Sequence, residues 1–219
     1  MSALEEVRYC LACGGPTVLR QPDGDGRDRQ VCTQCDRVHY ENPRIVTGCI
    51  IETEGGLLLC KRSIEPQDGL WTIPAGFLEL DEDIETGARR ETWEEALAKV
   101  HIFGLHSILD LPHVGQCYIL FRAKLEGDAY GPGEESREVK IFPKDSLPWN
   151  DLAFPVVHTS LQLFLEDEEQ GVRCLHRGAM LWSGEGGAYD HSQFRLTAHR
   201  RESFASVDEQ VLPPSEGSA

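Results

Sequence analysis

Two short cysteine pairs near the start of the sequence constrain the fold of this chain more than any other feature. Two residues separate Cys10 from Cys13 and Cys32 from Cys35, and 18 residues lie between the pairs. This spacing is typical of zinc sites in which two turns each supply two thiolates to one tetrahedral ion. We therefore expect residues 1–42 to form a small four-cysteine zinc ribbon.

Two other interpretations of these cysteines are less favoured. A pair of disulfides would indicate an exported domain, but the sequence begins without the basic and apolar segments of an export signal. A catalytic zinc ion needs a free coordination position, which four protein ligands do not leave, so we expect a structural ion. Three further cysteines lie in apolar runs and are expected to be buried free thiols of a cytoplasmic protein: Cys49, Cys60 and Cys117.

The charge balance of the chain limits its partners. The 219 residues carry 21 basic and 37 acidic side chains, which gives a formal net charge of −16. Nucleic acids and anionic membranes are bound through clustered lysine and arginine, so we expect neither as a partner. In addition, no apolar run approaches the roughly 18 residues of a membrane span.

Hydrophobic periodicity predicts an α+β domain after the ribbon. Two amphipathic segments indicate helices near 84–99 and 154–169, and the acidic end of the second, at 166–169, is expected to be solvated. Runs of β-branched and apolar residues indicate the strands. These are expected at 45–51, 57–62, 100–111, 116–125 and 136–142.

The domain is predicted to cover residues 43–170. Beyond it, glycine, serine and proline become frequent and the periodicity fades. We expect a C-terminal extension over 171–219 that wraps the domain near 171–182 and is disordered over 205–219.

The helix predicted at 84–99 carries three glutamates on one side. On a helical wheel, Glu91, Glu94 and Glu95 fall within a sector of roughly 100°, which we expect to face solvent. The opposite side, which includes Trp93, is predicted to face the core. Carboxylates at this spacing repel each other. Because no lysine compensates them, the pattern indicates bound Mg²⁺ or Mn²⁺, which prefer oxygen ligands; the alternative is a solvated acidic face.

The sequence around these glutamates resembles the signature of the Nudix hydrolase family, G-x5-E-x7-R-E-U-x-E-E-x-G-U, in which U is apolar. The chain follows it from Gly76 to Ala98, with Arg90 in the arginine position. There are two departures. Thr92 replaces an apolar residue and Leu97 replaces the final glycine, but every charged member is present. The resemblance implies a Nudix α/β/α sandwich with a mixed sheet, preceded by the zinc ribbon.

The resemblance also implies how a catalytic ion would be held. Glu91 and Glu95 would be the principal ligands of Mg²⁺ or Mn²⁺, with Glu94 close by and bridging a further ion. The carbonyl of a loop residue near Ala75 or Gly76 would complete the shell.

Catalytic roles are implied in the same way. Arg90 would pair with Glu82 or a neighbour and hold the loop against the helix. Family members often use a further glutamate from a late loop or strand, for which Glu138 is the candidate and Glu135 the substitute. Glu94, Glu138 and Arg90 are therefore the expected catalytic residues.

The family cleaves nucleoside diphosphates that are linked to another group. Over residues 9–170 the chain resembles FAD pyrophosphatases, and it lacks the S-Q-P-W-P-F-P stretch of NADH pyrophosphatases. The resemblance implies hydrolysis of the dinucleotide FAD to FMN and AMP, with ADP-ribose as an overlapping substrate, by a homodimer. The alternatives are a pyrophosphatase for NADH or another dinucleotide, an inactive module that senses a metabolite, and RNA decapping, which the net charge disfavours.

Four side chains outside the glutamate cluster are candidate substrate contacts. Arg62 ends a predicted strand and is expected to contact a phosphate, and Glu82 lies in the loop before the helix. Trp71 and Phe154 are candidates for stacking on flavin or adenine. Aromatic residues at strand spacing more often pack inward, so the alternative for both is a structural role.

Overall fold

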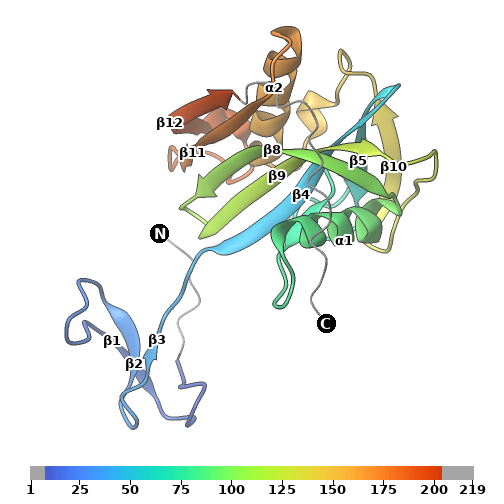
Figure 1. The fold of residues 1–219 in the computed structure, drawn as a ribbon. Coiled ribbons are helices and arrows are strands. Elements are labelled where there is room, and N and C mark those ends of the chain that lie inside the picture. Colours follow the sequence, from blue (N-terminus) through green and yellow to red (C-terminus); the bar gives the residue numbers. More distant parts are fainter. Residues whose placement is uncertain (1–7, 204–219) are drawn as a thin grey trace, which may run out of the picture.

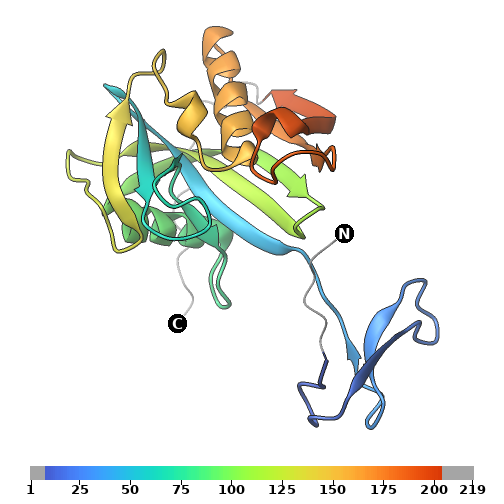
Figure 2. The same cartoon turned by 180° about the vertical axis from the view of Figure 1, so that it is seen from behind.

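The computed structural model describes residues 8–203, which form a small N-terminal ribbon and a larger α+β domain (Figure 1). The ribbon has three antiparallel strands, paired in the order β1 (Thr17–Arg20), β2 (Arg29–Cys32) and β3 (Val38–His39). Figures 1 and 2 show the ribbon set apart from the larger domain and joined to it by an extended segment. Its four paired cysteines lie together, so the predicted four-cysteine ribbon is confirmed.

Among the described residues, the larger domain contains a mixed sheet of nine strands. They are β4 (Arg44–Thr53), β5 (Gly56–Arg62), β6 (Trp71–Thr72), β7 (Ala75–Phe77), β8 (Val100–Leu111), β9 (Gln116–Leu125), β10 (Ser136–Phe142), β11 (Cys174–Trp182) and β12 (Phe194–Ser203). The main order is β10-β5-β4-β9-β8-β11-β12, while β6 pairs with β5 and β7 with β4. The pairs β4–β9 and β8–β11 are parallel, and the others are antiparallel.

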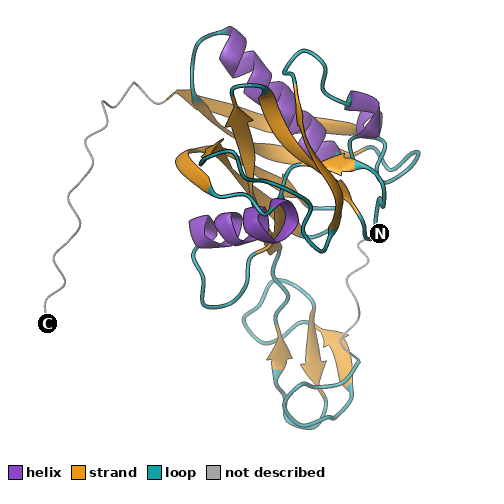
Figure 3. Ribbon diagram, turned by 90° about the vertical axis from the view of Figure 1, so that its right-hand side faces the viewer, coloured by secondary structure: helices purple, strands orange, loops and turns teal. Residues whose placement is uncertain are grey.

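The two α-helices, α1 (Ile84–Ala96) and α2 (Pro155–Glu169), cover opposite faces of this sheet (Figure 3). Alternation along the strands separates two cores. Ile50 belongs to the core under α2, whereas its neighbours Cys49 and Ile51 belong to the core under α1. The predicted sandwich of helix, sheet and helix is confirmed. Within the described part of the chain, neither helix has the length and apolar composition that crossing a membrane requires.

Helix α1 ends at Ala96, before the predicted end at residue 99. Leu97 takes left-handed backbone angles, with φ of 47° and ψ of 30°, and its N–H donates to the Trp93 carbonyl at 2.9 Å. The family signature has glycine at this position, and glycine adopts such angles readily. Leu97 therefore keeps the left-handed backbone expected of the signature glycine. At the other end, Asp83 accepts a hydrogen bond from the Thr86 N–H at 2.8 Å and caps the helix.

The sequence predicts an extension after residue 170, but the structure places two strands of the sheet there. Strand β11 pairs in parallel with β8, with His176 opposite Ser107, and β12 forms the outer edge. A glycine-rich loop with positive φ at Gly184 and Gly186 separates these strands. The predicted disorder over 205–219 lies outside the described residues.

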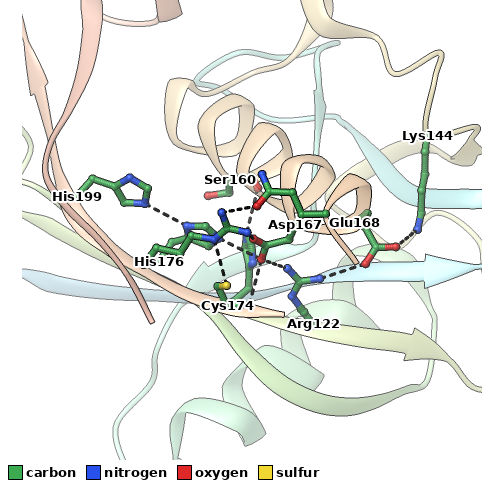
Figure 4. A network of polar contacts seen from close by, with 11 residues as sticks. Arg122, Lys144, Ser160, Asp167, Glu168, Cys174, His176 and His199 are labelled. Atoms are coloured by element: carbon green, nitrogen blue, oxygen red, sulfur yellow. Dashed lines mark hydrogen bonds and ion pairs between the residues drawn. The ribbon is translucent and has the colours of Figure 1, made fainter. Parts of the chain in front are cut away.

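A buried ion network joins α2 and the last two strands to the sheet (Figure 4). Asp167 of α2 is fully buried and forms an ion pair with Arg122 of β9, which is 2% exposed. Asp167 also accepts a hydrogen bond from Arg201 of β12 at 2.8 Å and lies 3.1 Å from a ring nitrogen of His176 in β11. The expectation of a solvated acidic end at 166–169 is therefore wrong for Asp167.

Candidate active site

Helix α1 presents its three glutamates to different environments. Glu91 and Glu95 are mostly buried, at 9% and 6% exposure, whereas the Glu94 side chain is 54% exposed. Thr92 is fully buried, and Trp93, which the helical wheel assigns to the core, is 49% exposed. The acidic face is thus rotated away from solvent relative to the prediction, and two of its carboxylates lie against neighbouring backbone.

Strand β7 supplies that backbone. The Ala75 N–H donates to Glu95 Oε2 at 3.2 Å. A Cβ atom added to Gly76 would meet the Glu91 carboxyl group at 2.3 Å, so this close approach requires glycine. The backbone of β7 therefore borders the same space as the two carboxylates.

Arg90 connects the preceding loop to the glutamates. Its guanidinium donates to both carboxylate oxygens of Glu82, at 3.0 and 2.7 Å, and to the Phe77 carbonyl at 3.0 Å. The same group donates to Glu91 at 2.6 Å and to Glu94 at 3.0 Å. Its hydrogen bonds to Glu82 lower the pKa of that carboxyl to about 2.

Burial makes the ionised forms of two carboxylates costly. It raises the pKa of Glu95 to about 8, and the negative charges of Glu91 and Glu135 add to this shift. Burial also raises the pKa of Glu91, against the lowering effect of Arg90. A cation held here would favour the ionised forms, so this set of oxygen donors fits a hard divalent ion.

The three glutamates do not bring their carboxylate oxygens within 4.8 Å of one another in this structure, and one nitrogen of Arg90 contacts both Glu91 and Glu94. Elsewhere among the described residues, two groups bring their ligand atoms within 4.8 Å of one another: the four ribbon cysteines, and the set of His106, Asp167 and His176. The second group does not fit a metal ion, since two arginines already balance the charge of Asp167.

The ribbon cysteines fit a structural zinc ion. The distance between sulfur atoms is 3.7 Å from Cys10 to Cys35, 3.5 Å from Cys13 to Cys32, and 3.4 Å from Cys13 to Cys35. Tetrahedral zinc with bonds of about 2.3 Å to sulfur separates its ligands by about 3.8 Å. The Ala12 N–H also donates to Cys10 Sγ at 3.4 Å, an arrangement that suits a thiolate.

A cavity of about 1150 Å³ lies beside helix α1. Its acidic end is lined by Glu91, Glu94, Glu95, Glu134 and Glu135. Aromatic side chains from separate segments also line the cavity: Tyr118, Phe154, Tyr189 and Phe194. A ligand that combines a metal-binding group with a planar ring matches both kinds of side chain.

Two of the four predicted substrate contacts lie on this cavity. Arg62 lines it, donates to the Pro66 carbonyl at 2.9 Å and covers the Phe154 ring at 5.0 Å from the ring centre. Phe154 also lines it. Trp71 does not, because it is 7% exposed and packs edge-on against Phe142, with ring centres 4.8 Å apart. The structural alternative is therefore the better interpretation of Trp71.

Glu82 and Glu138 are also placed away from the cavity lining. Glu82 is instead the partner of Arg90. Glu138 is exposed on β10, where a register shift after Ser136 interrupts the alternation. The substitute, Glu135, lines the cavity, and its charge contributes to the raised pKa of two α1 carboxylates.

Sequence reasoning missed Tyr189 and Phe194 as site residues. Tyr189 lies in the loop between β11 and β12, and Phe194 opens β12. No motif marks either residue, and the signal that identifies them is the pairing of β11 with β8, which is visible only in the fold.

Two models of known protein families match the chain. The model of the NUDIX domain matches residues 42–162, more than half of the chain, and the model described as Nudix N-terminal matches residues 8–41. The chain belongs to the Nudix hydrolase family. The first match contains the acidic helix of this Nudix protein, and the second contains the four ribbon cysteines.

Several curated proteins are similar to it. An NAD-capped RNA hydrolase NudC from Chromobacterium violaceum is 30% identical over 69% of this chain and 56% of its own length. An ADP-ribose pyrophosphatase from Methanocaldococcus jannaschii is 31% identical over 50% of this chain and 67% of its own. A MutT-like protein from Streptomyces ambofaciens is 33% identical over 47% and 64%. The chain thus spans between 56% and 67% of the length of these relatives.

Solved structures agree with the fold. A NUDIX hydrolase from Nitrosomonas europaea is 46% identical, with a TM-score of 0.76 over 78% of this chain and 98% of that one. An ADP-ribose pyrophosphatase from Streptococcus suis is 25% identical, with a TM-score of 0.50 over 62% of this chain and 98% of its own. The Nudix fold predicted from the signature is confirmed.

Proposed function

We propose that this Nudix hydrolase cleaves the pyrophosphate bond of nucleoside diphosphate derivatives, with FAD cut to FMN and AMP and with ADP-ribose as an overlapping substrate. The observation that supports this most is the cavity, which combines a carboxylate-rich end with aromatic walls. Relatives named ADP-ribose pyrophosphatase and NAD-capped RNA hydrolase support activity on nucleotide derivatives. The choice of FAD rests on the resemblance over residues 9–170.

The acidic end is where Mg²⁺ or Mn²⁺ would be held. Glu91, Glu94 and Glu95 would supply the carboxylate ligands, and the backbone at Gly76 borders the same space. When bound, such an ion neutralises charge on the pyrophosphate oxygens and acidifies water. This neutralisation matters because the chain itself carries a formal net charge of −16.

Two side chains would position the ligands and accept a proton. Arg90 fixes Glu91 and Glu94 relative to the loop before α1. Glu135, on the cavity wall, is the candidate that accepts the proton of the attacking water. As the water oxygen bonds to one phosphorus, the bridging P–O bond breaks and the other phosphate leaves with the bridging oxygen. FAD would then yield FMN and AMP.

Hydrolysis of NADH or of NAD-capped RNA is the second candidate, favoured by the name of the Chromobacterium violaceum relative. A negative protein is poorly suited to a polyanionic RNA, so a free dinucleotide is the better substrate. A homodimer and a cytoplasmic location stay predictions, the first from family resemblance and the second from the expected free thiols.

The test is a substrate panel with the purified full chain. FAD, ADP-ribose, NADH and NAD-capped RNA are incubated with Mg²⁺ or Mn²⁺, and products are separated by chromatography. We expect FMN and AMP from FAD, and AMP with ribose phosphate from ADP-ribose. The FAD assignment is wrong if both substrates are untouched while another is turned over. Saturable binding of FAD without turnover of any compound would instead support a metabolite-sensing module.

A further inference from the structure

The loop between β11 and β12 brings an aromatic side chain to the cavity from outside the segment matched by the NUDIX domain model, which ends at residue 162. This side chain is Tyr189, which lines the cavity and is 43% exposed. The loop is closed by the Ser183 N–H, which donates to the Gln193 carbonyl at 2.9 Å, and by the Asp190 N–H, which donates to the Gly187 carbonyl at 3.0 Å. Tyr189 is therefore presented by an internally hydrogen-bonded loop.

The flanking strands are also anchored. Met180 of β11 and Phe194 of β12 belong to or pack against the core under α2, and both line the cavity. Beyond them, the network around Asp167 ties both strands to α2 (Figure 4). The hairpin therefore holds its loop at a defined position beside the cavity.

Phe154 and Tyr189 have different surfaces available to a ligand. The Arg62 guanidinium covers the Phe154 ring at 5.0 Å, and it is held there by the Pro66 carbonyl. The Tyr189 ring meets Phe154 in a T-shaped contact, with ring centres 6.1 Å apart and an angle of 62°. Phe154 is thus covered by one neighbour and contacted by another, whereas Tyr189 keeps an exposed surface.

We propose that Tyr189 is the stacking platform for a planar ring of the substrate, with Phe154 packed against it and Arg62 over the Phe154 ring. This assignment rests on the proposed function, since it concerns a nucleotide derivative in the same cavity. It moves the stacking role from Trp71, which is in the core, to a residue of the β11–β12 loop. The last two strands then contribute a side chain to substrate binding.

Stacking explains how one site accepts different compounds. Every heteroaromatic ring has a π-face, so an aromatic platform recognises rings without reading their hydrogen-bonding edges. Adenine and the flavin ring share this chemistry, and FAD carries both. Loss of such a platform weakens binding by about 10-fold, which corresponds to about 1.4 kcal/mol.

Binding of the two products tests the platform without turnover. The Kd values of AMP and FMN are measured by equilibrium dialysis for the full-length wild type and for Tyr189→Ala, Tyr189→Phe and Tyr130→Ala. Tyr130 is the matched control, because it is 40% exposed and does not line the cavity. We expect Tyr189→Ala to raise at least one Kd by about 10-fold, and the other two variants to match the wild type.

The changes in the Kd values of AMP and FMN identify which ring of the substrate stacks on Tyr189. A loss confined to AMP assigns adenine to Tyr189, and a loss confined to FMN assigns the flavin. Unchanged Kd values for both products in Tyr189→Ala overturn the proposal, as does wild-type protein that binds neither. Melting temperatures of all variants should agree, because residue 189 lies in an exposed loop.

Turnover separates this proposal from the proposed function. With FAD or ADP-ribose as substrate, Tyr189→Ala should raise KM by about 10-fold and leave kcat unchanged, since stacking on a ring stabilises the bound substrate and the transition state equally. If the wild type hydrolyses none of the panel, the proposed function fails, and the dialysis result still decides the role of Tyr189.

Discussion

The Arg90 guanidinium and the Glu82 carboxylate form a two-point ion pair, with one nitrogen–oxygen distance of 3.0 Å and another of 2.7 Å. The pair joins the loop before α1 to the middle of the helix, next to Glu91 and Glu94. Only arginine presents two such donors in a fixed plane, because the lysine ammonium acts as a single point charge. We therefore expect the position of the loop before α1 to depend on the planar group and not only on its charge.

Arg90→Lys is the variant that separates these two properties. It keeps the charge but loses the second hydrogen bond, so we expect kcat to fall by about 10- to 100-fold through misalignment, with the far-ultraviolet circular dichroism unchanged. Arg20→Lys is the control, because Arg20 forms an exposed ion pair with Asp36 in the ribbon. Wild-type kcat in Arg90→Lys would show that the two-point geometry is not needed.

Glu95→Gln is expected to separate catalysis from stability. Burial raises the pKa of Glu95, so a neutral amide of the same shape should leave the melting temperature unchanged or slightly higher. Turnover should fall by about 100-fold or more, because the variant lacks a carboxylate that we propose as a ligand of the catalytic ion. Calorimetric titration with Mn²⁺ should show weaker binding, whereas Glu85→Gln, at an exposed position of the same helix, should behave like the wild type. A large loss of thermal stability in Glu95→Gln would contradict this role.

Two glutamates near the start of β10 give a direct test of the catalytic base. Glu135 lines the cavity and Glu138 does not, so we expect Glu135→Gln to lower kcat by about 100-fold and Glu138→Gln to leave it unchanged. Both variants remove one carboxylate from the same short segment, so each serves as the control for the other. The reverse result would favour Glu138, the first candidate from the sequence, as the base.

Local spacing in the sequence is sufficient to predict the four-cysteine ribbon and the helix that carries the glutamates, and the resemblance to the Nudix signature implies the sandwich. The sequence does not reveal Asp167, whose neighbours Glu166 and Glu168 suggest a solvated run. The difference is that Asp167 points at Arg122, 45 residues away in the chain, and no local pattern encodes that contact. For the same reason Tyr189 could not be placed, since its position depends on how β11 pairs in the sheet.

The side-chain roles were harder to predict than the elements. A helical wheel gives the angle between residues but not the rotation of the whole helix about its axis. As a result, the wheel places Trp93 in the core although it is half exposed, and Glu91 in solvent although it is mostly buried. The signature marks Gly76 as a glycine, but only the structure shows the reason, since an added Cβ would meet the Glu91 carboxyl group.

Loss of zinc should unfold the ribbon without stopping catalysis. Within the described part of the chain, the residues that line the cavity start at Val46, so the ribbon contributes none. We expect Cys32→Ala to abolish zinc content and to increase hydrogen exchange over residues 8–41, because so small a ribbon depends on its ion. The kcat in excess Mg²⁺ should match that of Cys117→Ala, which removes a cysteine outside the ribbon. A protected ribbon in zinc-free protein would argue against a structural ion.

His106 should make the folded state sensitive to acid. Its side chain is fully buried under α2, where one ring nitrogen lies 3.0 Å from the Ser160 carbonyl. Burial, assisted by the positive charge of Arg122, lowers the pKa of His106 to about 3. An unfolded chain takes up this proton near pH 6.5, so between the two values the unfolded state binds more protons. The free energy of unfolding should therefore fall as the pH drops below about 6.5.

Well below pH 6.5, the free energy of unfolding should fall by about 1.4 kcal/mol per pH unit because of this residue. Between pH 7 and pH 5, the contribution of His106 should fall by roughly 2 kcal/mol. Urea unfolding of the wild type and of His106→Gln at both pH values measures it, because glutamine remains neutral. His106→Gln should be less stable at pH 7, where it loses native packing, but its stability should decline less on acidification. His101→Gln, at an exposed position of the same strand, should keep the wild-type decline. An equal decline in His106→Gln would mean that other buried groups, such as His176, determine the response to acid.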